Sequence, residues 1–175
     1  MVARIVIAAA ALSLTLSTVF AAVPADLQPL AFLLGEWQAE GSGAPGLGTG
    51  TATFTTGLQD RVILRNSYAE YPEAEGRAAS RHDDLMAIYA APGGARADYY
   101  DSEGHVIRYL VQSPAAGQAI FLSEAAPGQP RFRLSYALDD TGELKGGFAI
   151  SPPDAPDAFK PYLTWGSRKT PQTTR

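Results

Sequence analysis

From Gly35 onward, apolar and polar residues alternate along short segments that tight turns separate. A period of two is the pattern of a β-strand with one buried face. Residues 91–94 (APGG), 101–104 (DSEG) and 139–142 (DDTG) are turn sequences between aromatic-rich segments. Connections this short leave no room for a crossover helix, so consecutive strands have to run antiparallel. The chain is therefore predicted to be all-β.

One short helix is predicted before the strands. Over residues 24–34, Leu27, Leu30 and Leu34 recur at helical spacing, Asp26 can cap the first turn, and a glycine follows. The ten strands that follow are expected at 35–41, 48–57, 60–71, 81–91, 95–101, 104–112, 117–124, 130–138, 142–150 and 161–169.

Polar residues on the apolar faces favour a barrel with a ligand cavity over a sandwich. A dry sandwich core would exclude Asn66, His82 and Asp84, whereas an up-and-down barrel that encloses a ligand tolerates them. The sets expected to share one inward face are Val62-Leu64-Asn66-Tyr68, His82-Asp84-Met86-Ile88, His105-Ile107-Tyr109-Val111 and Phe132-Leu134-Tyr136-Leu138.

The first 21 residues have the features of a secretory signal peptide. Arg4 provides a positive charge, residues 5–16 are apolar, and Val19 and Ala21 form a small-residue cleavage site. The apolar run is too short for a bilayer span, which needs about twenty residues. A periplasmic or secreted protein is predicted, and an uncleaved N-terminal anchor is the alternative.

The remainder reads as one barrel domain over residues 22–170 and a disordered tail over 171–175. The absence of cysteine excludes disulfides, thiol nucleophiles and thiolate metal sites. A net charge of −4 without any basic run argues against a nucleic-acid partner. After the first 21 residues no apolar run approaches membrane length, so no membrane span is expected in the mature chain.

Residues 30–41 (LAFLLGEWQAEG) resemble the opening of the lipocalin-like (calycin) barrels, in which a short helix leads into a Gly-x-Trp on the first strand. Gly35 and Trp37 occupy that motif here. Arg168, in residues 164–168 (TWGSR), matches the family's basic residue on the last strand. The resemblance extends to uncharacterised exported bacterial proteins of this fold and, distantly, to the haem-binding nitrobindins.

The resemblance implies a barrel that Trp37 closes at one end, with Arg168 stacked on the indole as a cation–π partner. Nitrobindin-like haem binding needs a histidine late in the barrel, and no histidine follows His105. We therefore predict neither haem nor another cofactor, and no metal ion.

Tyrosines spread over most strands suggest a pocket with aromatic walls, although barrel packing explains them too. In this hypothesis the walls hold a small, partly apolar ligand, and polar groups orient its polar end. The residues predicted to bind the ligand are Asn66, Tyr68, His82, Tyr109 and Tyr136.

Two other functions remain open. An enzyme on the same barrel would use His82, Asp84 and His105, which are the ligand types of a non-haem iron site. An envelope interaction module would use exposed edge strands or the loop over residues 41–50, without a cavity. That loop matches a dinucleotide-binding glycine pattern at 41–46, but a strand follows it where the pattern requires a helix. No protein partner is identifiable.

Overall fold

The computed structural model describes residues 23–43 and 48–171, and the predicted signal peptide lies outside these residues. The observed elements are η1 (Ala25–Leu33), β1 (Gly35–Gly43), β2 (Gly48–Gly57), β3 (Val62–Tyr71), β4 (Ser80–Ala91), β5 (Gly94–Asp101), β6 (Val106–Gln112), β7 (Gln118–Ser123), β8 (Arg131–Leu138), β9 (Leu144–Ser151) and β10 (Lys160–Lys169).

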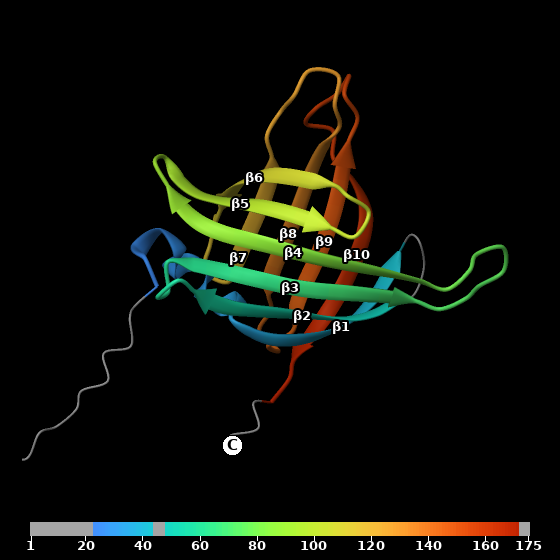
Figure 1. Ribbon diagram of the computed structural model, residues 1–175, viewed down its shortest axis with the longest axis horizontal. Coiled ribbons are helices and arrows are strands. Elements are labelled where there is room, and N and C mark those ends of the chain that lie inside the picture. Colours follow the sequence, from blue (N-terminus) through green and yellow to red (C-terminus); the bar gives the residue numbers. More distant parts are fainter. Residues whose placement is uncertain (1–22, 44–47, 172–175) are drawn as a thin grey trace, which may run out of the picture.

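The ten strands form one closed antiparallel barrel (Figure 1). Each strand pairs with its neighbours along the chain, and β1 pairs with β10 to close the sheet, with Trp37 opposite Lys169. The predicted all-β, up-and-down barrel with a short N-terminal helix is confirmed. Within the described residues every strand has a partner on both sides, so an interaction module that uses open edge strands is not what this chain forms.

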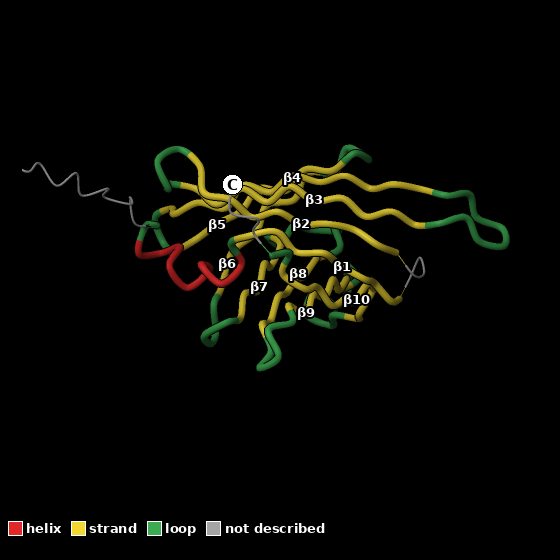
Figure 2. The backbone as a smooth tube through the Cα atoms, turned by 90° about the horizontal axis from the view of Figure 1, so that it is seen from below, coloured by secondary structure: helices red, strands yellow, loops and turns green. Residues whose placement is uncertain are grey.

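The N-terminal helix is a 3₁₀ helix at one end of the barrel (Figure 2). Leu27, Leu30 and Leu33 are buried because three residues per turn place every third side chain on one face. Leu34, predicted at α-helical spacing, is only half-buried. The predicted cap by Asp26 is wrong, since Pro24 is the N-cap and no side chain caps the helix.

The β2–β3 hairpin turns through three residues with left-handed backbone. Leu58, Gln59 and Asp60 have φ values of 52°, 57° and 63°. A left-handed stretch cannot continue a strand, so β3 begins at Val62, two residues later than predicted. No helix in the described part of the chain is long and apolar enough to cross a membrane.

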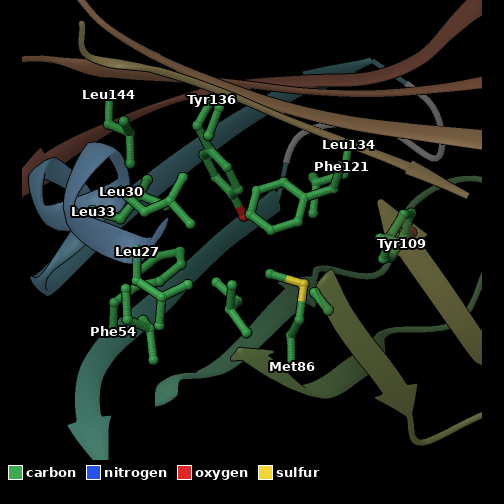
Figure 3. Packing of buried hydrophobic residues seen from close by; sticks show 14 of the residues in the cluster. Leu27, Leu30, Leu33, Phe54, Met86, Tyr109, Phe121, Leu134, Tyr136 and Leu144 are labelled. Atoms are coloured by element: carbon green, nitrogen blue, oxygen red, sulfur yellow. The ribbon is translucent and has the colours of Figure 1, made fainter. Parts of the chain in front are cut away.

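The apolar core fills only the half of the barrel next to η1. The three helix leucines pack there with aromatic and aliphatic side chains from the strands (Figure 3). The largest strand side chains of this core are Trp37, Phe54, Ile63, Met86, Ile88, Tyr109, Phe121, Leu134, Tyr136 and Leu144. The helix thereby plugs one end of the barrel, and the other half encloses a cavity.

Candidate functional site

The cavity has a volume of about 810 Å³, and all ten strands contribute to its lining. Cavities of this size match small-molecule sites in general. The helix leucines and Trp37 do not line it. Tyr109, Leu134 and Tyr136 belong to both the core and the lining, so they form the floor between the packed half and the open half.

A buried arginine lies among these floor residues. The Arg65 guanidinium donates from Nη2 to Asp84 Oδ2 and to Ser67 Oγ, each at 3.2 Å. Its charged end also lies 6.0 Å from the centroid of the Tyr136 ring. The side chains of Arg65 and Asp84 are 9% and 5% exposed, so the ion pair is almost fully removed from water.

The two charges respond differently to this burial. Desolvation opposes the charge on Arg65, but Asp84 and the neighbouring tyrosines outweigh it and raise the pKa of Arg65 above its ordinary value. Desolvation also raises the pKa of Asp84, and the attraction of Arg65 and His82 offsets this only in part. Burial raises the pKa of Tyr136 to about 12, so its hydroxyl is a neutral donor at neutral pH.

Three buried polar atoms at this floor have no hydrogen-bond partner among the described residues: Arg65 Nε, Asp84 Oδ1 and the Tyr136 hydroxyl oxygen. Buried polar groups in folded proteins almost always have partners. The set comprises an N–H donor, a carboxylate acceptor and a hydroxyl that can do both. It suits a ligand whose polar end both donates and accepts hydrogen bonds.

Aromatic and aliphatic side chains form the opposite wall. Phe132 and Phe148 stack with ring centroids 5.8 Å apart, and Trp165 packs edge-on against Tyr136 at 6.0 Å. Trp165 reaches this position because its cross-strand partner is Gly146, where a Cβ would overlap the indole ring. The wall can hold an apolar or aromatic group.

Two histidines and two carboxylates lie at one side of the cavity. His82 Nδ1 lies 3.1 Å from Glu103 Oε1, and its Nε2 lies 2.9 Å from the Tyr99 hydroxyl. His105 Nδ1 lies 2.8 Å from Asp101 Oδ2. All four residues line the cavity, and Glu103 and His105 are exposed, which places the group at the cavity mouth.

The predicted ligand-binding residues divide into two groups. His82, Tyr109 and Tyr136 line the cavity. Asn66 is exposed and lines only a shallow depression on the outside of the barrel, so its predicted inward facing is wrong. Tyr68 lies on the same face of β3 as Asn66 and borders both the cavity and the outer depression. The Arg81 guanidinium carbon lies over the Tyr68 ring, 4.1 Å from the ring centroid.

The facing of β3 is the reverse of the prediction. Ile63, Arg65 and Ser67 point inward, in place of Val62, Leu64 and Asn66. Alternation alone does not distinguish the two faces of this strand. A charged residue is expected on the outside of a barrel, so Arg65 favoured the wrong facing. The available signal was Asp84, an acid on the inner face of the next strand that could neutralise a buried arginine.

The cation that lies over Trp37 is Lys169, and the prediction of Arg168 is wrong. Trp37 is buried and donates from Nε1 to the Leu33 carbonyl oxygen at 2.7 Å. Lys169 Nζ lies over the indole, 5.2 Å from its centroid, whereas Arg168 is exposed and its Nη2 lies 3.9 Å from Glu143. Trp37 pairs with Lys169 across the closing strands, and alternation turns Arg168 to the other face.

The proposed catalytic set comes together only in part. His82 Nε2 lies 3.9 Å from Asp84 Oδ2, but Asp84 is paired with Arg65, and His105 pairs with Asp101. Of the loop predicted over residues 41–50, residues 44–47 lie outside the described residues.

Comparison with known proteins finds structural similarity alone. A de novo designed fluorescence-activating β-barrel is 13% identical over 80% of this chain and 95% of the design, with a TM-score of 0.41. The barrel EF1p2_mFAP2b, solved bound to DFHBI, is 11% identical over 82% of this chain and 98% of that chain, with a TM-score of 0.32. No protein-family model and no curated protein matches the sequence.

Proposed function

We propose that this protein binds a small, partly apolar molecule inside its barrel. The observation that carries the proposal is the cavity of about 810 Å³, with an aromatic wall and a polar floor. A folded chain that needed only stability would fill this space, because interior voids forfeit packing energy.

The ligand that fits best has an aromatic or aliphatic body and one polar, net-neutral end. Phe132, Phe148 and Trp165 provide the apolar contacts. The polar end meets Arg65 and Asp84, which neutralise each other, and the Tyr136 hydroxyl. A charged end without a counter-charge would face a costly burial there, and a neutral amide, alcohol or protonated acid would not.

Binding of the neutral fluorescent probe N-phenyl-1-naphthylamine tests the proposal. We expect saturable binding of about one probe per chain, with enhanced probe emission in the apolar environment. Ala69→Phe fills the cavity, because Ala69 lines it opposite His82, and should weaken binding at least tenfold. Asn66→Phe places the same ring on the outer face of the same strand and is the matched control.

The two variants distinguish binding inside the cavity from binding on the outer surface. Weakened binding in Ala69→Phe with unchanged binding in Asn66→Phe supports the cavity as the site. Equal binding by both variants places the probe on the outside, and the absence of saturable binding by the wild-type chain removes the proposal.

Export belongs to the same proposal. The charged, apolar and small-residue segments of residues 1–21 support secretion, and the lipocalin-like opening at Gly35 and Trp37 supports a carrier or binding role outside the cytoplasm. Cell fractionation of the full chain, with N-terminal sequencing of the product, tests this. A mature N-terminus at Ala22 in the exported fraction is expected, and a full-length chain in the cytoplasm would contradict export.

A further inference from the structure

We infer that His82, Asp101 and Glu103 form a binding site for a divalent transition-metal ion at the mouth of the cavity, contrary to the expectation from sequence. One potential ligand atom from each residue lies within 4.8 Å of the other two. The inference shares the unpartnered Asp84 carboxylate with the proposed ligand site, but it does not require that ligand to bind.

The local fold brings these residues together from two strands and the turn between β5 and β6. His82 points inward from β4, and Asp101 ends β5. Asp101 Oδ1 accepts the backbone N–H groups of Glu103 and His105, at 3.0 and 2.9 Å. These bonds hold the turn so that Glu103 lies beside His82.

The imidazole of His82 is oriented as a metal ligand requires. One ring nitrogen, Nε2, lies 2.9 Å from the Tyr99 hydroxyl, and that hydroxyl lies 3.4 Å from Asp101 Oδ2. With the proton on Nε2, the Nδ1 lone pair is directed towards Glu103, 3.1 Å away. Such outer hydrogen bonds set the tautomer and orientation of ligating histidines.

A second observation indicates that a cation belongs here. Asp84 lies directly opposite Asp101 in the β4–β5 pairing, so two inward carboxylates meet on one face. The Asp84 side chain is 5% exposed, and its Oδ1 has no partner among the described residues. Arg65 neutralises Asp84. While His82 and His105 are neutral, Asp101 and Glu103 are two negative charges that a divalent ion can balance.

One nitrogen and two carboxylate ligands select the class of ion. Imidazole favours Zn²⁺ and its first-row neighbours, whereas Mg²⁺ and Ca²⁺ prefer oxygen ligands alone. His105 Nδ1, 2.8 Å from Asp101 Oδ2 and 3.8 Å from Glu103 Oε2, is placed to act as a fourth ligand or to hold Asp101. The ion would lie at the cavity opening, where a bound molecule could contact it.

Metal binding to the full chain after chelator treatment tests the inference. We expect one Zn²⁺ per chain by calorimetry, Co²⁺ binding with visible d–d absorption, and no comparable affinity for Mg²⁺. His82→Gln and Glu103→Gln should each weaken Zn²⁺ binding at least tenfold. Asp83→Asn is the matched control, because Asp83 neighbours His82 but pairs on the outside with Arg81.

Glu103 is an exposed turn residue, so Glu103→Gln should fold even if His82→Gln does not; circular dichroism checks both. Loss of Zn²⁺ affinity in these variants, with wild-type affinity in Asp83→Asn, supports the site. Absence of stoichiometric Zn²⁺ binding by the wild-type chain, or equal affinity in Glu103→Gln and Asp83→Asn, overturns it. Probe binding in the cavity is measured separately, so the two proposals fail independently.

Discussion

Lys169 lies over the face of Trp37 where the first and last strands close the barrel, with Nζ 5.2 Å from the indole centroid. The contact joins the two ends of the described barrel. Gly35 makes room for it, because a Cβ there would lie 2.5 Å from Lys169 Cε.

Lys169→Met should lower the free energy of unfolding by about 0.5–1 kcal/mol, the worth of an exposed cation–π contact. Arg168→Met removes a neighbouring positive charge on the other face and should change the free energy of unfolding by less than about 0.5 kcal/mol. Urea unfolding measures both. Equal effects of the two substitutions would show that the Trp37 contact does not stabilise the closure.

Gly35→Ala should destabilise the fold by about 1–3 kcal/mol, because Gly35 has a φ of 121° that side chains rarely adopt. The added methyl also meets the end of the Lys169 side chain. Most of the loss should persist in a Lys169→Ala background, since truncating the lysine relieves the contact but leaves the backbone strain. A fully restored stability would assign the whole effect to the contact.

Gly146→Ala should move Trp165 out of the cavity wall. The new Cβ would overlap the indole, so the emission of Trp165 should shift and binding of N-phenyl-1-naphthylamine should weaken several-fold. Overpacking of this kind costs about 1–3 kcal/mol of stability. Gly147→Ala, whose Cβ would lie 3.2 Å from Ser135 Oγ, serves as the control and should leave emission and binding near wild type.

Asp84→Ala should cost about 3–5 kcal/mol, because it leaves the Arg65 charge buried without its partner. The double variant Arg65→Met with Asp84→Ala removes both charges and should be more stable than Asp84→Ala alone. A thermodynamic cycle from denaturant unfolding measures the coupling. Additive losses would mean that the two side chains do not act as a pair.

Acid should destabilise the fold in part through Asp101. Burial opposes its charge, but hydrogen bonds from the His105 backbone and side chain outweigh burial and lower the pKa of Asp101. A carboxyl with a lowered pKa stabilises the fold above its unfolded pKa of about 4, and this stability disappears as pH falls through the folded value. Asp101→Asn keeps an acceptor oxygen in the turn without titrating there. Its melting temperature should therefore fall less steeply than that of the wild type below pH 4.

A cavity residue was predictable only where the pattern of its own strand was enough to place it on the inner face. His82, Tyr109 and Tyr136 each share a face with apolar residues of their own strands, and the structure places all three at the cavity. Arg65 was missed because a charged residue is expected outside, and its inward position depends on Asp84 of the neighbouring strand. Glu103 was missed because an exposed turn residue shows no sequence sign of its contact with His82.

Sequence alone determined the class of fold, because strand periodicity, turn residues and short connections act over a few neighbouring residues and leave antiparallel pairing as the only arrangement. Tertiary structure decided the inward face of β3, the choice of Lys169 over Arg168, and the depth to which η1 fills the barrel. Each of these depends on register between strands or on packing between distant segments. Register shifted by one residue reverses every side chain of a strand, and only the closed barrel selects among the alternatives.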